Sequence, residues 1–327
     1  MDRDEVFPSS PFDGADADLI LRSAEGAKFR VSKAILRETS PFFRDLLSLP
    51  QPPDSTPDGP AVEDGLPVIP VTESSATLDS LLRICYPIQS PAIFSLVTIE
   101  NVLKAALKYD MEVAVSKMRE ALQASHFQSG YYAVEVFVVA CDLKLEDDAR
   151  AAARNTLKDP LFGPFDAYLE RISAAVYHRL LKYHQRASAK ASSTFADSSN
   201  ARQELQSWTH QFFQCTSHSC SANEAVCCLE HGQVRISSWW LHYIKRVKAV
   251  VTVTPLRNDI FDVPFLVKSI FNSEHRVCDP CKQRLLSHWE QISGYLKDAR
   301  DDAISKVEID LSSAGFTKKK AGGIPPG

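Results

Sequence analysis

The sequence predicts an α+β fold, in which a short N-terminal sheet capped by helices is followed by mainly α-helical regions. Two short apolar runs, Leu19–Leu21 and Phe29–Val31, flank a turn that contains Gly26. This pattern is typical of a β-hairpin with glycine at the position that needs a positive φ. Beyond this opening, apolar residues recur at helical spacing along most of the chain. One hairpin followed by many helical segments therefore indicates the fold class.

Two helices are expected directly after the hairpin. The first is short and includes Ala34, Ile35 and Leu36. Ser40 is predicted to be the N-cap of the second, because serine accepts a hydrogen bond from the first turn and Pro41 suits the first helical position. The expected buried face of this second helix consists of Phe42, Phe43, Leu46 and Leu47.

A third strand and three further helices complete the predicted N-terminal domain. Residues 68–71 read as a strand, in which Pro70 favours an edge position because proline cannot donate to a sheet. Residues 77–86 have leucines at helical spacing. Thr98 is expected to cap the next helix, and residues 112–124 form the last one.

This N-terminal sequence resembles the BTB (POZ) domain family. The family's opening pattern is present as Asp18-Leu19, Gly26, Phe29-Arg30-Val31-Ser32-Lys33, Ile35-Leu36 and Ser40-Pro41-Phe42-Phe43, with Ser32 where the family usually has histidine. The resemblance covers about residues 16–125, and it implies homodimerisation. Candidate side chains for the dimer interface, several of which must instead fill the core of one chain, are Leu19, Leu21, Val31, Ile35, Leu36, Phe42 and Phe43.

Helical patterns continue beyond the BTB-like region. Residues 126–187 look like the BACK-like helical extension that often follows a BTB domain, and residues 165–186 are expected to form its last helix. The Ser- and Ala-rich residues 188–200 are predicted to be a linker. Residues 1–15 and 317–327 are expected to be a flexible N-terminal segment and a disordered tail.

Residues 201–316 form a second compositional unit, which holds six of the eight cysteines and all four tryptophans. Many fungal BTB proteins carry a similar Cys- and Trp-rich C-terminal half, so the chain resembles a fungal-type member of the family. Helices are predicted around residues 205–213, 234–251 and 285–307.

Cys278-Asp279-Pro280-Cys281 is the sharpest chemical signal, since two thiolates in one tight turn can bind the same zinc ion. Cys215 and Cys220 are the candidate second pair of a structural zinc site, with His218 and His275 as alternative ligands. Unligated, mostly buried thiols are the competing interpretation, and a redox pair is a third one. Cys85 and Cys141 lie on apolar helical faces and are expected to pack in the core.

Composition and charge restrict the class of protein. The 327 residues are 24% charged with a net charge of −4, which gives no general attraction to nucleic acid or to an anionic membrane. No apolar run is long enough to span a membrane, and the polar, acidic N-terminus does not resemble a secretory signal. The cytoplasm or the nucleus is therefore the expected location, and the cysteines are expected to be thiols or metal ligands.

Three further patterns bear on function. No P-loop, Gly-x-Gly-x-x-Gly, Gly-x-Ser-x-Gly or His-Glu-x-x-His motif occurs. Lys245, Arg246 and Lys248 lie near Trp239, Trp240 and Tyr243, and an amphipathic helix with buried aromatic rings is favoured over a nucleic-acid surface. Val71-Thr72-Glu73 is similar to an element with which some BTB adaptors bind a cullin, but a strand end or helix cap at Glu73 is the stronger interpretation.

The sequence as a whole predicts a non-enzymatic interaction protein that pairs with itself. It could be a ubiquitin-ligase substrate adaptor that binds a cullin scaffold and an unknown client protein. The alternatives are a transcription-linked or general assembly module with no ligase role and, in the C-terminal half, a thiol- or zinc-dependent enzyme.

Overall fold

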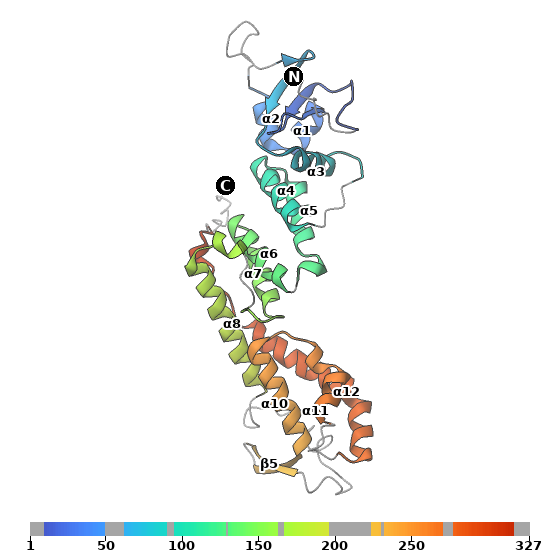
Figure 1. Cartoon of the computed structure of the whole chain (residues 1–327), viewed down its shortest axis with the longest axis vertical. Coiled ribbons are helices and arrows are strands. Elements are labelled where there is room, and N and C mark those ends of the chain that lie inside the picture. The colour runs from blue at the N-terminus through green and yellow to red at the C-terminus, as the bar shows by residue number, and fades with distance from the viewer. Residues whose placement is uncertain are drawn as a thin grey trace, which may run out of the picture. The chain divides into compact units, whose positions relative to one another are not determined.

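The chain divides into two units, Met1–Ser125 and His126–Gly327, which are drawn in Figure 1. The computed structural model describes residues 10–49, 62–89, 95–128, 130–162, 167–195, 224–229, 232–270 and 277–316. Within these ranges, no helix has the length and apolar character that crossing a membrane requires. The first unit contains a four-stranded sheet with helices and the second is mostly helical, which confirms the predicted fold class.

The sheet of the first unit has the strand order β2-β1-β4-β3. Leu19 lies opposite Val31 in the antiparallel pair of β1 and β2, and Ile20 lies opposite Val68 in the parallel pair of β1 and β4. The predicted hairpin is confirmed, with Gly26 at a φ of +92° in its turn. The strands are β1 (Leu19–Arg22), β2 (Lys28–Val31), β3 (Val62–Glu63) and β4 (Leu66–Pro70).

Five α-helices accompany the sheet in the described part of this unit. Ser40 caps α2 as predicted, because its Oγ accepts a hydrogen bond of 3.1 Å from the N–H of Phe43, and it also donates one of 2.5 Å to the carbonyl of Tyr109. The predicted buried face of α2 is wrong in part, since only Phe43 is buried. These helices are α1 (Lys33–Thr39), α2 (Pro41–Leu46), α3 (Ser75–Cys85), α4 (Leu96–Lys108) and α5 (Glu112–Leu122).

Two local predictions in this unit need correction. Thr98 lies inside α4, because the helix begins at Leu96 with Ser95 in the cap position. Pro70 is in an internal strand rather than an edge strand. The sheet tolerates proline there because β3 pairs with β4 only at Leu66 and Pro67.

The flexible N-terminal segment was expected to extend to residue 15, but its Phe12 belongs to the core. The Phe12 side chain is fully buried and its ring lies 5.8 Å from Phe29 and 5.3 Å from Tyr86, centroid to centroid. Its carbonyl accepts a hydrogen bond of 2.9 Å from the N–H of Arg30, so the segment also runs along the outer edge of β2. Residues 1–9 lie outside the described residues.

The second unit begins with short helices that follow a 3₁₀ turn (Figure 1). Its long helices α8 and α12 contact each other. Its helices are α6 (Tyr131–Asp142), α7 (Glu146–Thr156), α8 (Ala174–Thr194), α10 (Ser238–Val253), α11 (Val263–Ile270) and α12 (Asp279–Ser305), and its strands are β5 (Glu224–Leu229) and β6 (Gly232–Ser237). Single 3₁₀ turns lie at η1 (Ser125–Phe127), η2 (Ala167–Arg171), η4 (Asp259–Phe261) and η5 (Ser312–Ala314).

The helix expected over residues 165–186 is shifted and longer. It begins at Ala174, where the Ser173 side chain accepts a hydrogen bond from the N–H of Val176, and it runs to Thr194. Residues 188–194 of the predicted linker are therefore helical. Alanine has the highest helix propensity, and Ala187 and Ala191 are buried, so this stretch is part of the packed unit.

The C-terminal predictions have mixed outcomes. Residues 234–237 belong to β6, so the helix expected over 234–251 begins only at Ser238. The helix expected over 285–307 lies within α12, which begins earlier, at Asp279, and ends at Ser305. The helix predicted near residues 205–213 and the tail at 317–327 lie outside the described residues.

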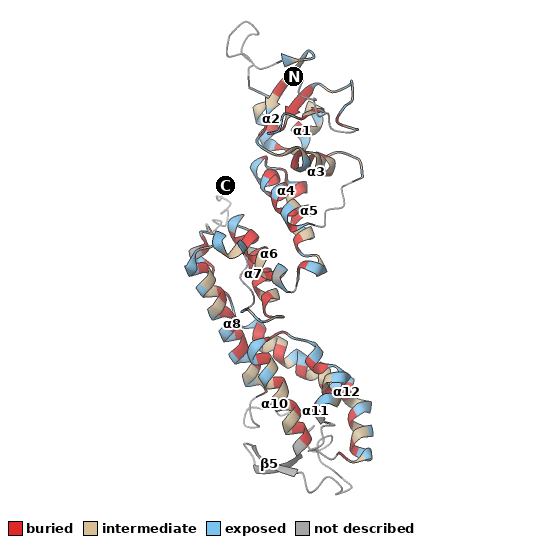
Figure 2. Ribbon diagram, viewed as in Figure 1, coloured by how far each residue is buried: buried red, intermediate tan, exposed pale blue. Residues whose placement is uncertain are grey.

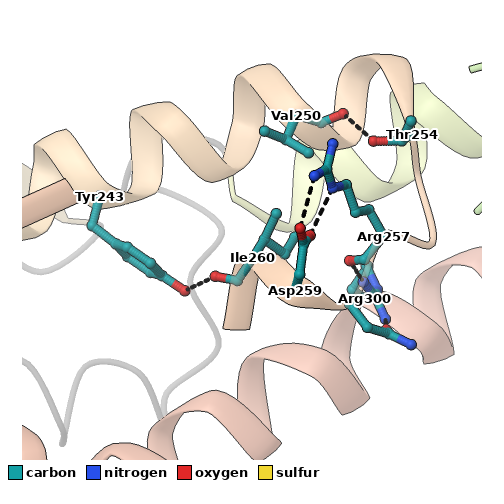
Figure 3. A network of polar contacts seen from close by, with 8 residues as sticks. Tyr243, Val250, Thr254, Arg257, Asp259, Ile260 and Arg300 are labelled. Atoms are coloured by element: carbon teal, nitrogen blue, oxygen red, sulfur yellow. Dashed lines mark hydrogen bonds and ion pairs between the residues drawn. The ribbon is translucent and has the colours of Figure 1, made fainter. Parts of the chain in front are cut away.

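A buried cluster around Arg300 joins α10, η4 and α12. Figure 2 shows buried positions along both long helices of this region. Arg300 donates hydrogen bonds of 2.6 Å to the carbonyl of Arg257 and 2.8 Å to Oδ1 of Asn258, and its guanidinium lies over the ring of Phe261. Tyr243 donates to the carbonyl of Ile260 in the same network (Figure 3). These contacts fix the turn between α10 and α11.

Candidate interaction surfaces and the predicted zinc site

The candidate dimer residues fall into two groups by exposure. Two of the seven reach the surface of the chain: Ile35 is half-buried and Phe42 is 42% exposed. The other five are buried in the first unit and so contribute to its core: Leu19, Leu21, Val31, Leu36 and Phe43. An interface formed without rearrangement can therefore use only Ile35 and Phe42 of this set.

Phe42 is the exposed member of a cluster of three aromatic rings. Its centroid lies 5.3 Å from that of Phe43 and 5.4 Å from that of Tyr109, and Tyr109 stacks on Phe43 at 5.0 Å. Contacts of this kind hold an aromatic side chain in place before any partner binds. The structure thus presents a fixed apolar ring at the start of α2.

Glu73 is the centre of a polar cluster between the β4–α3 turn and the end of α4. Lys108 Nζ lies 2.8 Å from Glu73 Oε1 and 2.6 Å from Thr72 Oγ1, and the hydroxyl of Tyr109 donates to Glu73 Oε2. Burial acts to raise the pKa of Glu73, but the hydrogen bonds from Lys108 and Tyr109 outweigh it and lower that pKa. Burial and the Glu73 carboxylate raise the pKa of Tyr109. At neutral pH Glu73 is therefore a carboxylate and Tyr109 a neutral phenol.

The contacts of Glu73 bear on both interpretations of this residue. The N-cap of α3 is Ser74, whose Oγ accepts from the N–H of Thr77, so the carboxylate of Glu73 does not cap the helix. The Glu73 side chain is 10% exposed. A cullin contact through the Glu73 carboxylate would first have to break its pairing with Lys108 and Tyr109.

A shallow hollow of about 300 Å³ lies beside this cluster. Its walls combine the turn before α3 with the exposed face of α4: Thr72, Glu73, Ser74, Thr77, Asn101, Lys104, Ala105 and Lys108. Lys104 pairs with Glu100 at 2.6 Å. All of these residues except Ala105 have polar side chains, and the charged groups of Glu73, Lys104 and Lys108 are paired.

The predicted zinc site is only partly within the described residues. Cys278 is in the cap position of α12 and Cys281 is in its first turn, where it is buried. Cys215, Cys220, His218 and His275 lie outside the described residues. Within the described ranges, no group of three His, Cys, Asp or Glu side chains is placed to hold a metal ion. The four-cysteine site stays a prediction.

Of the two thiols expected to pack in the core, Cys141 is buried and Cys85 is half-buried. Burial raises the pKa of Cys85 to about 11 and that of Cys141 to about 12. Both are therefore protonated at neutral pH, and a thiolate nucleophile is not expected at either position.

The aromatic side chains at the start of α10 face inward. Trp239, Trp240 and Tyr243 are buried, and Tyr243 packs edge-on against Trp289 at 5.3 Å. Their rings are not available for stacking with nucleic-acid bases, as the amphipathic-helix interpretation requires.

Sequence reasoning missed that Tyr109 belongs to the aromatic cluster and that Tyr109 and Lys108 both bind Glu73. Both lie at the end of α4, and their partners Glu73, Phe42 and Phe43 are distant in sequence. The only local signal was Tyr109 itself, an amphipathic residue at the end of an apolar helix, where its ring can be buried while its hydroxyl finds a partner.

Comparisons with known proteins gave one family match and one similar solved structure. The model of the BTB/POZ domain family matches residues 11–126. Among solved structures, the BTB domain of zebrafish PATZ1 is similar at 19% sequence identity and a TM-score of 0.25, over 33% of this chain and 75% of that chain. No curated protein matches the sequence.

The family match ends at residue 126, so the BACK-like and fungal-type interpretations of the remaining residues stay predictions. Within the match lie the hairpin, the capped helix α2 and the aromatic cluster at Phe42. We conclude that residues 11–126 of this chain are a BTB/POZ domain.

Proposed function

We propose that this chain is a non-enzymatic interaction protein that forms a homodimer through its BTB/POZ domain and holds a second partner with its C-terminal unit. The observation that carries the proposal is the family match over residues 11–126, since this domain is a protein-interaction module. Self-association is a general property of such domains.

The exposed apolar side chains near α2 support the choice of interface. Phe42 is held in place by Phe43 and Tyr109, and Leu49, shortly after α2, is more exposed still. Ile35 on α1 adds half-buried apolar surface. A stable obligate dimer buries about 2,000 Å² or more in total, so these residues would form the centre of a larger contact.

The mass of the full chain, measured by light scattering across micromolar concentrations, tests this proposal. We expect the mass of two chains, and we expect Phe42→Lys to shift the protein toward one chain because a buried lysine would lack a partner. Val113→Lys on α5, which also replaces an exposed apolar side chain, is the matched control and should leave the dimer intact.

A strict monomer at these concentrations would overturn the proposed homodimer. Dissociation by Val113→Lys but not by Phe42→Lys would place the interface elsewhere on the domain. Circular dichroism of each variant verifies that the helical content is retained.

The proposal extends to a role as a cullin-binding substrate adaptor, whose client would be bound by the C-terminal unit. Because Glu73 is paired internally, we expect any cullin contact to tolerate Glu73→Gln. Mixing the full chain with a cullin N-terminal domain and measuring the mass tests this role. An unchanged mass would leave an assembly module with no ligase function.

A further inference from the structure

The segment that follows α12 is extended and amphipathic. Ile309 and Leu311 are each 4% exposed, whereas Glu308 before Ile309 and Asp310 before Leu311 are exposed. The alternation is that of a strand with one buried face, yet residues 307–311 belong to neither of the sheets of the described structure. The segment is therefore held by side chains rather than by a neighbouring strand.

Three cationic side chains of the second unit bind this segment, and a fourth binds the η5 turn that follows it. Arg186 Nη2 donates a hydrogen bond of 2.7 Å to the carbonyl of Glu308, and Arg150 Nη1 donates one of 3.0 Å to the carbonyl of Ile309. Lys144 Nζ donates one of 2.7 Å to the carbonyl of Ala314, and Arg179 forms an ion pair with Asp310. We call these four residues, Lys144, Arg150, Arg179 and Arg186, the cationic groove.

The contacts are of two kinds, and both suit a peptide as well as a tethered segment. Arg150 and Arg186 bind main-chain carbonyls of the extended part, so they recognise an extended backbone whatever its side chains, whereas Lys144 binds a carbonyl of the η5 turn. Buried Ile309 and Leu311 then require apolar residues at alternate positions, and Arg179 favours a carboxylate between them. Main-chain hydrogen bonds with alternate side-chain pockets are how proteins commonly bind extended peptides.

The fit between segment and groove is incomplete. A cavity of about 520 Å³ is bordered by both, with Arg150 and Arg186 on one side and Asp310, Leu311 and Phe316 on the other. Arg150 also pairs with Glu146 on its own helix at 2.6 Å, so only part of its charge is directed at the segment. Displacing the segment would therefore leave Arg150 with a partner.

We propose that the cationic groove is a docking site for an extended peptide of a partner protein, with acidic and apolar residues in alternation, and that Glu308–Leu311 occupies it as an internal competitor. A tethered segment has an effective concentration in the millimolar range, so a free peptide of equal intrinsic affinity binds weakly until the segment is released. The proposal concerns the second unit alone and does not depend on dimerisation by the BTB/POZ domain.

Binding of a fluorescein-labelled peptide with the sequence of residues 306–316, measured by anisotropy, tests the proposal. The chain ending at Lys306 lacks the internal competitor, so we expect it to bind the peptide at least tenfold more tightly than the full chain does. The full-length variant Asp310→Lys loses the ion pair with Arg179 and should bind with intermediate affinity. This variant keeps the test valid if the shortened chain does not fold.

The contacts predict which changes matter. A peptide with lysine in place of Glu308 and Asp310 should bind at least tenfold more weakly to the shortened chain, and so should the natural peptide to its Arg186→Ala variant. Lys190→Ala removes an exposed cation from the same helix α8 outside the groove and should have no effect.

Two outcomes would overturn the proposal. One is the absence of peptide binding both to the shortened chain and to Asp310→Lys. The other is a light-scattering mass of the chain ending at Lys306 that is half that of the full chain, because the segment would then occupy the groove of a second copy.

Discussion

The hydroxyl of Tyr109 donates a hydrogen bond to the carboxylate of Glu73, which lies 36 residues earlier in the chain. The bond joins the end of α4 to the turn between β4 and α3, and Lys108 adds an ion pair to the same carboxylate. Tyr109 also accepts the Ser40 hydrogen bond at its carbonyl, so three separate elements of the BTB/POZ domain meet at this residue.

Glu73→Gln is expected to destabilise the domain. The change removes the negative charge that faces Lys108 and Tyr109, and hydrogen bonds to charged groups contribute about 1.5–3 kcal/mol. Because Lys108 is partly exposed, we expect the free energy of unfolding in urea to fall by about 1–2 kcal/mol. Glu38→Gln on the exposed face of α1 is the control and should change it by less than about 0.5 kcal/mol. Equal effects of the two substitutions would contradict the role of the cluster.

The Glu73 carboxylate should also make the free energy of unfolding depend on pH. Its pKa in the folded chain is lowered from the ordinary value of 4.5, so the folded state favours the charged form. The resulting stabilisation is present above pH 4.5 and is lost as the pH falls through the lower, folded-state pKa. Urea midpoints measured between pH 7 and pH 3 should therefore fall more steeply for the unchanged chain than for Glu73→Gln. An equal fall of the urea midpoint with pH in the two proteins would show that the pKa of Glu73 is the same in the folded and the unfolded state.

Phe12→Ala should be strongly destabilising although Phe12 lies close to the N-terminus. The substitution empties a fully buried position between Phe29 and Tyr86 and removes the ring below the Arg83 guanidinium. Truncation of a buried phenylalanine costs about 3–5 kcal/mol. The matched control is Phe162→Ala, whose ring is 80% exposed and should cost less than about 0.5 kcal/mol. Thermal unfolding followed by circular dichroism compares the two, and a smaller loss for Phe12→Ala would mean that the segment is not part of the core.

Arg300→Met should destabilise the second unit, although methionine has a volume similar to that of arginine and is more apolar. The Arg300 side chain is buried, and its removal would take a hydrogen-bond donor from the carbonyl of Arg257 and from the amide oxygen of Asn258, which belong to exposed residues. We expect a loss of about 1–2 kcal/mol in the free energy of unfolding, because two hydrogen bonds from a charged group are removed. Lys297→Met, at an exposed position on the same helix, is the control and should change little. A neutral Arg300→Met would indicate that apolar packing replaces the network of Figure 3.

Elements defined by neighbours in sequence could be predicted, and those defined by distant contacts could not. The hairpin was readable because Gly26 and the two apolar runs specify a local turn, and Ser40-Pro41 specify a local helix start. Phe42 and Phe43 are adjacent and chemically identical, so only tertiary contacts decide which ring is buried.

The hydrophobic period and the residue composition each led to one wrong prediction. Val234 and Ile236 fit a strand as well as a helix because the run is short, and pairing with β5 selects the strand. The Ser- and Ala-rich stretch after residue 187 has the composition of a linker, but its alanines are good helix formers and pack in the unit. Of the candidate site, the exposed position of Phe42 and the pairing of Glu73 depended on tertiary contacts.

The continuity of α8 also restricts where recombination could exchange the C-terminal region of this chain. At 1.5 Å per residue its 21 residues span about 32 Å, and the helix contacts both α10 and α12. A recombination event within residues 188–194 would cut through a packed helix and separate surfaces that bury each other. The C-terminal region of an ancestor or a homologue could therefore be exchanged as a cassette only together with α8.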